Sequence, residues 1–590
     1  NTDRQSTNQR QELFMQGSTP TSVSQSRNRQ GTERLTLHND FTMNKPFWTY
    51  ITADFNHSKR DNSFNSAFDQ WDDSLTASMR TVGMGEGKAW SIKVDAQGAF
   101  KVGKKQRHTT YFMLFEHQND ESEQASRYST RHFAEPSSDV RHNTSSISRK
   151  TTYAMANMGH NTDLTEKIKM HIGAGVTMMK NNVRDYLYHP DSLMLVSQID
   201  ALSAITDPTN SYDSRTERVE GSVGMSIFQQ GTYKYSDDLP YTVGYRRWHV
   251  GVSVPFKAER LDYQRGSLDT LARQNTVFAN FDASFHHRMG GGKRSLKFNA
   301  SHKRSSAQLT DMITYRDDSQ PLVVKLGNPD LKGAVTSNFS ASYRDEKNPN
   351  RKWNVKTELT YNHREVAQSV LYNPTTGVMT YKPTNVEGAY RVGADFGMHG
   401  NLDKAKHWTW MNESHVWFHH YKDHSMLEGE TQSRERAVDN ILLRTHGYVN
   451  YSRDKFSLFL KGDISWRRSA GNMRGFNSIN ALDFEYGVLA RYTLPRLNTT
   501  LSADAMMNSR RGYGSSLLNT DDFIVNASIS QPLLKGKLIA RLEAFDLLHQ
   551  LSNVYSSYNA QGRTETWHNT VPSYVMLHLT YKLNVMPKKR

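Results

Sequence analysis

Cysteine is absent from this sequence of 590 residues, proline occurs only 16 times, and no long apolar run is present. The absence of cysteine excludes disulfides, zinc-thiolate sites and a cysteine nucleophile. A membrane helix needs about 18 or more consecutive apolar residues, so helical membrane spans are excluded, whereas spans built from strands are not. Because there is no proline-rich linker and no shift in composition, residues 1–590 are predicted to form one domain.

Apolar residues are also few. They make up 36% of the chain, and the mean hydropathy is −0.74, yet aromatic residues reach 11%. Such a chain is too polar for large buried cores and too aromatic for a disordered polypeptide. Strands with one apolar face and one wet face would explain both properties.

Concentrated charge is missing as well. The 74 Lys+Arg and 59 Asp+Glu residues give a formal net charge of +15, but no block of five like charges occurs. Because nucleic-acid-binding proteins gather their basic residues into patches or arms, this dispersal argues against a nucleic-acid partner. The chain begins at Asn1 with neither Met nor a signal-peptide pattern, so we expect a mature or trimmed fragment.

What the sequence does contain is regular alternation of apolar and polar residues. In EKIKMHIGAGVTMM (166–179), every second residue from Ile168 to Met178 is apolar, and lysine, histidine, glycine and threonine lie between them. Strand side chains point to opposite faces with a period of two, so the stretch predicts a strand with one apolar face. Alternating runs of about 10 to 15 residues are longer than sandwich strands and match membrane-spanning ones. Similar runs lie within 35–55, 90–96, 111–115, 277–285, 335–343, 523–529 and 575–583.

The connections between these runs alternate between short turns and long polar loops. Ten short turns and eleven long loops predict 22 strands, provided that a weak first strand lies at 10–16. This alternation is typical of outer-membrane barrels, whose periplasmic turns are short and whose surface loops are long. The long loops are expected near 61–85, 119–147, 181–214, 306–333, 366–384, 422–437 and 549–571.

The sequence therefore predicts an all-β fold: a transmembrane antiparallel β-barrel of about 22 strands in the outer membrane of a Gram-negative bacterium, with short periplasmic turns and long extracellular loops. Backbone groups in hydrocarbon must be satisfied within the protein, which a closed barrel achieves. Apolar side chains should contact outer-membrane lipid and lipopolysaccharide, while lysine, histidine and glycine face a wet interior. Residues 197–205 could form a short helix inside a long loop, but an ordered surface-loop turn is the favoured interpretation.

The segment HWTWMNESHVWFHH (407–420) carries the richest set of candidate binding residues. Trp408 and Trp410 on one face are expected to belong to an interfacial aromatic girdle. Imidazole and carboxylate groups on the other face could ligate a metal or a metal-bearing ligand, or could simply form a polar lumen surface. Residues two apart on a strand are about 7 Å apart, so a site would need neighbouring strands. The lumen-facing candidates for substrate binding are His407, Glu413, His415 and His419.

Other motifs give weaker signals. GMGEGK (83–88) and GGGKRS (290–295) contain the glycines of a phosphate loop, but strand sequence follows each, so hairpin turns are expected. No catalytic triad order, paired-carboxylate motif or His-Glu-x-x-His occurs in a supporting context, so the sequence predicts neither an enzyme nor a cofactor or resident metal. Asp-Ser/Thr-Leu tripeptides in three expected loops leave O-glycosylation open at Ser74, Ser192 and Thr270.

Several stretches resemble one protein family. KLGNPDLKGAVTSNFSASYR (325–344) resembles the Gly-Asn-Pro-x-Leu segment that precedes a mid-barrel strand in TonB-dependent receptors, and 529–550 and 573–584 resemble their closing strands. Residues 188–212 are similar to a loop in a subgroup described as an outer-membrane β-barrel protein family. The chain departs from the family pattern at Lys332-Gly333, where Pro-Glu is usual, and at its end, where NVMPKKR replaces a terminal aromatic.

The resemblance implies a globular plug and a TonB-contacting segment upstream of this chain, and energised uptake of an oligosaccharide, a peptide or a metal chelate. The implied partners are the TonB system, acting through the plug that this chain lacks, and a surface lipoprotein. The alternative is a barrel without transport that serves as a scaffold, together with other barrel subunits, in a complex for protein export, insertion or surface-lipoprotein display. A surface enzyme or an adhesin is a third interpretation.

Overall fold

The computed structural model describes residues 2–13, 19–43, 47–72, 74–102, 107–133, 136–191, 205–234, 242–373, 375–425, 434–471, 478–513, 519–551, 554–558, 562–569 and 573–582. One sheet of 28 strands accounts for most of these residues, which confirms the predicted all-β fold. Helical segments in the described residues include α2 (Leu309–Met312) and the 3-10 helix η3 (Leu534–Gly536). Within the described residues, no helix is long and apolar enough to cross a bilayer.

The strands follow one another along the chain with few interruptions. Their bounds are β1 Thr2–Leu13, β2 Thr19–Met43, β3 Phe47–Asp72, β4 Ser74–Val102, β5 Arg107–His132, β6 Ser137–Asp163, β7 Ile168–Tyr188, β8 Tyr212–Lys234, β9 Thr242–Arg265, β10 Leu268–Val277, β11 Asn280–Met289, β12 Arg294–Arg304, β13 Arg316–Gln320, β14 Val323–Leu326, β15 Val335–Asn348, β16 Arg351–Tyr372, β17 Met379–Val386, β18 Ala389–Asn401, β19 Trp408–Ser425, β20 Arg434–Arg453, β21 Phe456–Gly471, β22 Ile479–Thr493, β23 Thr500–Arg511, β24 Asp521–Leu533, β25 Leu538–Phe545, β26 Val554–Tyr558, β27 Gly562–Asn569 and β28 Tyr574–Tyr581.

The pairing of these strands reduces them to 22 staves of one wall. The second half of β9 pairs with β10 and its first half with β11, so β10 and β11 are one stave with a short break. In the same way β16 pairs with β17 and then with β18. Counting each interrupted stave once, and leaving out the hairpins β13–β14 and β26–β27, gives 22 staves from the 28 strands. The predicted strand number is confirmed, and the first strand starts earlier than expected, at Thr2.

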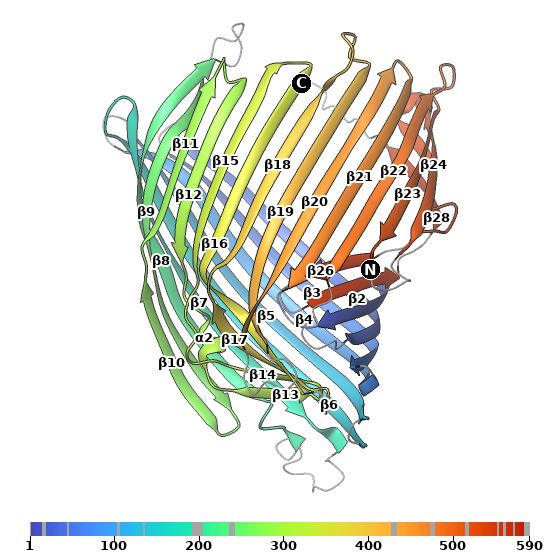
Figure 1. Cartoon of the computed structure of the whole chain (residues 1–590). Helices are drawn as coiled ribbons and strands as arrows, with labels where there is room; N and C mark the ends of the chain where they lie inside the picture. The colour runs from blue at the N-terminus through green and yellow to red at the C-terminus, as the bar shows by residue number, and fades with distance from the viewer. Residues whose placement is uncertain are drawn as a thin grey trace.

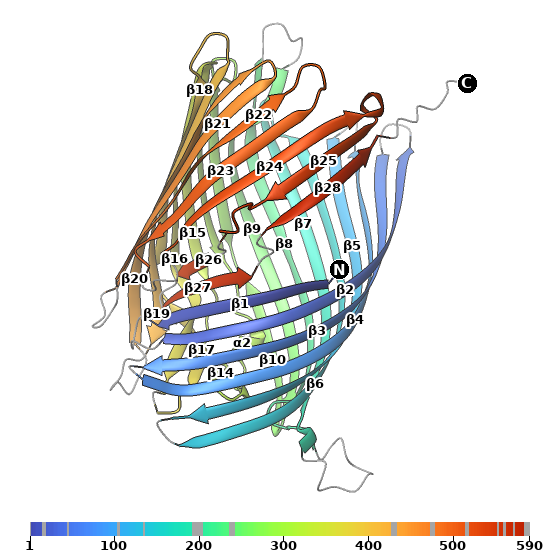
Figure 2. The ribbon, with the colours of Figure 1, turned by 90° about the vertical axis from the view of Figure 1, so that its right-hand side faces the viewer.

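Neighbouring staves are antiparallel, and the sheet curves into a tilted cylinder (Figure 1). The two ends of the wall are β1 and β28. The last stave, β28, pairs with β25, whereas β1 pairs with β2 and with the β27 hairpin strand. Within the described residues no ladder joins β28 to β1, so the cylinder is open along this seam, where the β26–β27 hairpin lies between the two ends (Figure 2).

The two rims of the cylinder differ, as predicted. One rim has short turns, such as the four residues between β11 and β12 and the two between β15 and β16, and this is the periplasmic rim. At the other, extracellular rim, many strands continue as long hairpins. The ladder of β3 and β4 runs on to Asp72 and Ser74, and that of β5 and β6 to His132 and Ser137.

Two of the predicted long loops are therefore wrong, because 61–85 and 119–147 lie mostly in these extended ladders. Above the hydrocarbon region a strand needs no apolar face, so its alternation disappears although its backbone ladder continues. The expected turn at 83–88 is likewise a stretch of β4, whereas Gly290–Gly292 form a turn with positive φ angles. Ser74 and Thr270 lie in β4 and β10, while Ser192 and most of the loop segment 197–205 lie outside the described residues.

The predicted apolar face is the exposed outer face of the wall. On β21, Leu460 and Ile464 are each 47% exposed, whereas Lys461 and Asp463, on the opposite face, make ion pairs. The same arrangement holds across the sheet, because antiparallel partners share a face. Exposed apolar side chains at the predicted positions include Ile92, Val94, Met113, Phe115, Ile172, Met178, Phe281, Phe285, Phe339, Phe523, Ile529, Leu577 and Leu579. This belt has the character of a lipid-facing surface.

Candidate functional site

The inner face of β19 carries three of the four predicted binding residues, because they share the parity opposite to the exposed Trp408 and Val416. The structure brings Glu413 and His415 together with a residue of the next strand. His407 lies apart, at the periplasmic turn, with its Nδ1 3.6 Å from Asp403. His419 lies further along β19 and forms a hydrogen bond with the Tyr421 hydroxyl, 2.6 Å from its Nδ1.

The residue that joins Glu413 and His415 is His446 of β20. It lies directly opposite Glu413 in the ladder, and its Nε2 is 3.3 Å from the Glu413 carboxylate. The His415 and His446 rings stack at 6.1 Å between centroids, with 15° between their planes. His446 was not predicted from the sequence. The predicted loop 422–437 could have indicated it, because two antiparallel strands pair symmetrically about the centre of their loop, and residues 413 and 446 are equally far from the centre of this loop.

Charged side chains of alternating sign surround these three residues on the lumen wall. Asp395 of β18 is 2.7 Å from His415 Nδ1, and Arg444 of β20 is held by Asp463 of β21 at 2.7 Å. Because each cation has an acidic neighbour, the wall presents many hydrogen-bonding groups without a strong local field. Further pairs on this face are Lys356–Glu358, Arg391–Glu358 and Lys461–Glu485. The predicted wet interior is thus a lattice of ion pairs and histidines.

The extracellular mouth holds a second group of buried contacts. The connection between β12 and β15, residues 305–334, is called the inner loop here. It contains α2, β13 and β14, and it lies across the lower rim in Figure 1. Leu309 and Ile313 pack against Leu261 and Tyr263 of β9, forming a small apolar core. On its other side, β14 pairs in parallel with β17. The inner loop therefore connects the β9 and β17 parts of the wall.

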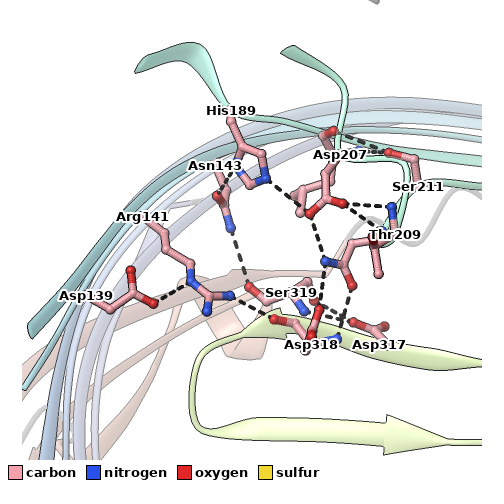
Figure 3. Close-up of polar contacts among 12 residues, drawn as sticks. Asp139, Arg141, Asn143, His189, Asp207, Thr209, Ser211, Asp317, Asp318 and Ser319 are labelled. Atoms are coloured by element: carbon pink, nitrogen blue, oxygen red, sulfur yellow. Dashed lines mark hydrogen bonds and ion pairs between the residues drawn. The ribbon is translucent and has the colours of Figure 1, made fainter. Parts of the chain in front are cut away.

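Polar contacts tie the inner loop to two further segments (Figure 3). Arg141 and Asn143 of β6 donate to the backbone oxygens of Asp318 and Ser319, at 2.9 and 3.4 Å. His189, next to the segment 205–211, bridges Asn143 Oδ1 and the Asp207 carboxylate at 3.0 and 3.1 Å. We call the following set the mouth network: Arg141, Asn143, His189, Asp207, Asn210, Arg265, Asp318 and Ser319.

Asn210 is the centre of the mouth network. Its Nδ2 donates to the carboxylates of Asp207 and Asp318, at 2.8 and 3.0 Å. Its Oδ1 accepts hydrogen bonds from the backbone N–H of Asp318 and from Arg265, both at 3.1 Å. Burial would raise the pKa of Asp207 and of Asp318, but hydrogen bonds from Asn210 and other donors outweigh it and hold each pKa below its usual value. Both carboxylates are therefore ionised at neutral pH.

A second bridge crosses the mouth between β16–β17 and the β3–β5 hairpins. The Thr376 carbonyl accepts a hydrogen bond from His132 Nδ1 at 2.7 Å. Gly377 has a φ of +69°, and a Cβ there would lie 2.9 Å from the Ala77 Cβ. Tyr372 packs with Met379 against Phe68. The mouth is thus spanned by connections that lie far apart in the sequence.

These features define a class of protein. A wall of 22 antiparallel staves, with an apolar outer face and a charged inner face, is a transmembrane barrel of the bacterial outer membrane. Residues 282–581, just over half of the chain, match the family model described as "Outer membrane protein beta-barrel family". The chain belongs to this family, which confirms the predicted localisation in the Gram-negative outer membrane.

Solved structures provide more distant similarities. The ferric preacinetobactin receptor from Acinetobacter baumannii is 10% identical, with 96% of this chain and 80% of that chain covered and a TM-score of 0.41. The ferric citrate transporter in its unliganded form is 9% identical, with 97% and 78% covered and a TM-score of 0.40. The ferric enterobactin receptor from Pseudomonas aeruginosa is 7% identical, with 96% and 81% covered and a TM-score of 0.39. No curated protein matches the chain.

Proposed function

We propose that this chain is the barrel of an outer-membrane receptor that imports a bulky nutrient, either an oligosaccharide, a peptide or a metal chelate. The observation that carries the proposal is the wall of 22 staves, because transporters with this strand number enclose a wide lumen that a plug domain fills. In the full protein, the TonB system would act on a plug upstream of Asn1. The segment 325–344, which resembles TonB-dependent receptors, supports the same proposal.

The cargo would contact the lumen wall of β18 to β21. His415, Glu413 and His419 lie on one face of β19, and the ion pairs around them offer donors and acceptors to a polar molecule. His407 would contact cargo only at the periplasmic end. The inner loop and the mouth network would then separate this lumen from the exterior until cargo arrives.

The test is uptake by cells that lack the gene and carry the full-length protein in its place. Depletion of oligosaccharides, peptides and ferric chelates from the medium is measured with and without a protonophore, because TonB-driven import requires the proton gradient. We expect one class to be depleted only in energised cells that make the protein. Replacing Glu413, His415 and His419 together should reduce this uptake at least tenfold. Depletion of none of the three classes would contradict the proposal.

The alternative is a scaffold subunit, and the extended extracellular hairpins favour it. The β3–β4 and β5–β6 ladders continue up to Asp72 and His132, and they offer strand surfaces outside the bilayer to other proteins. Gentle detergent extraction followed by mass spectrometry separates the two functions. A surface lipoprotein as the main partner would support uptake, whereas other barrels and periplasmic assembly factors would support the scaffold.

A further inference from the structure

The geometry points to a binding site for a divalent transition metal on the lumen wall, formed by Glu413 and His415 of β19 and His446 of β20. One ligand atom from each residue can be chosen so that all three lie within 4.8 Å of one another. Zinc binds imidazole nitrogen and carboxylate oxygen at about 2.0 to 2.2 Å, which places tetrahedral ligand atoms roughly 3.3 to 3.5 Å apart. The 3.3 Å between His446 Nε2 and the Glu413 carboxylate already meets this requirement. His415 would have to approach the other two ligand atoms, from which it is separated by at most 4.8 Å.

The two strands supply a rigid frame for this site. Glu413 and His446 are direct partners in the β19–β20 ladder, and His415 follows two residues later on the same face. Because the ladder fixes the backbone positions, metal binding would require changes in side-chain rotamers but no ordering of a loop. All three side chains are partly exposed, at 49% for Glu413, 33% for His415 and 31% for His446, so an ion in the lumen can reach them.

A neighbouring carboxylate prepares His415 for this role. The Asp395 carboxylate lies 2.7 Å from His415 Nδ1 and accepts its proton in a hydrogen bond. This bond fixes the tautomer and leaves Nε2 with a free lone pair, which is the arrangement found behind many metal-bound histidines. Arg444, the partner of His415 in the β19–β20 ladder, is held by three contacts of 2.7 to 3.2 Å to Asp463, which reduces its repulsion of a bound ion.

The donor set indicates which metals would bind and how. Two imidazoles and one carboxylate suit zinc and the neighbouring divalent ions of the first transition row better than calcium or magnesium, which prefer oxygen ligands. A bound metal would take the place of the direct contact between His446 Nε2 and the Glu413 carboxylate. Three protein ligands leave at least one coordination position open, so a bound ion could also accept a donor atom from a molecule in the lumen.

The test is metal binding by the full chain, purified in detergent. Zinc affinity is measured by calorimetry, and cobalt coordination by its visible absorption, which is intense only for low-coordinate sites. We expect one ion per chain, and a loss of affinity of at least tenfold in each of Glu413→Gln and His446→Gln. His420→Gln is the matched control, because His420 lies on the opposite face of β19 and pairs with Asp439. It should bind as the unmodified protein does.

Asp395→Asn gives a second test, since it keeps the shape of the side chain but removes the carboxylate that orients the His415 ring. We expect affinity to fall by about 10-fold to 100-fold. Heat-modifiable migration in gels shows that each variant is a folded barrel. Unchanged zinc affinity in folded Glu413→Gln and His446→Gln would overturn the inference. Because binding is measured without transport, this outcome is distinct from a failure of the proposed uptake.

Discussion

Replacing Asn210 with alanine removes four side-chain hydrogen bonds at the mouth, two of which join the segment 205–211 to Asp318 of the inner loop. Three of them involve a charged partner, from Asp207, Asp318 or Arg265. Hydrogen bonds to charged groups contribute about 1.5 to 3 kcal/mol and neutral ones about 0.5 to 1.5 kcal/mol, but partial exposure reduces these values. We therefore expect the docked inner loop to lose about 2 to 4 kcal/mol of local stability while the wall is unaffected.

The assay is amide hydrogen exchange of the full chain in detergent, followed at β13 and β14. A tenfold change in an equilibrium constant corresponds to about 1.4 kcal/mol, so exchange in these strands should accelerate by about 30-fold to 1000-fold. The Asp318 amide is the most direct reporter, because it donates to Asn210 Oδ1. Asn299→Ala is the control, since Asn299 bonds Ser340 on the wall, away from the mouth. Equal exchange rates at Asp318 in the Asn210 variant and the unmodified protein would refute this account of the mouth.

Three further predictions concern the mouth and the wall. The pKa values of Asp207 and Asp318 are lowered in the folded mouth, so their stabilisation is complete above the ordinary pKa of about 3.9 and is lost as pH falls through the folded pKa. The protection of β13 amides, corrected for the intrinsic pH dependence of exchange, should therefore fall below about pH 4. Gly327→Ala should loosen the inner loop by about 1 to 3 kcal/mol, measured by limited proteolysis, because the new Cβ would overlap the Ile313 carbonyl oxygen. Leu460→Arg places a charge on the lipid-facing surface and should destabilise the barrel by about 2 to 4 kcal/mol in urea-induced unfolding from bilayers.

Each of these predictions has a control in the same chain. Amide protection in β16, corrected for the intrinsic pH dependence of exchange, should not change over the pH range in which β13 loses protection, and a parallel loss there would indicate general unfolding instead. Gly462→Ala should be tolerated, because its Cβ would meet only the Glu485 carbonyl oxygen at 3.8 Å. Lys461→Arg, on the lumen face beside Leu460, should leave unfolding unchanged. A smaller effect for Leu460→Arg than for Lys461→Arg would reverse the assignment of the two faces.

The strands of the wall could be predicted from the sequence alone, because the pattern that specifies each strand lies within a short stretch of consecutive residues. Alternation at Ile172 or Phe285 reports directly which face a residue occupies, and the alternation of turns and loops gives the strand count. The same reasoning placed Glu413 and His415 on one face of one strand. Predicting His446 as a neighbour of Glu413 requires the register between two strands. This register depends on where the loop between them is centred, and the alternation within a single strand does not contain that information.

The mouth network could not be predicted in this way. Asn210 and Asp318 are 108 residues apart, and His132 and Thr376 are 244 apart. Each contact depends on how the completed cylinder brings its rim segments together. The long hairpins at this rim escaped prediction for a related reason, since strands above the bilayer keep their ladder but have no need of an apolar face.

The distribution of contacts indicates where this barrel changes shape. Moving a stave such as β20 would break backbone ladders with both β19 and β21, which involve most of its residues. Releasing the inner loop breaks shorter stretches of contact: the small core around Leu309, the β14–β17 pairing, the mouth network, and the hydrogen bonds that join Asn328 and Lys332 to the β16–β17 side of the mouth. Local opening follows the route that loses least burial and fewest hydrogen bonds. A molecule that binds outside the barrel can therefore shift the mouth between closed and open states, with the wall and the Glu413 site staying fixed, provided that it binds the open state more tightly.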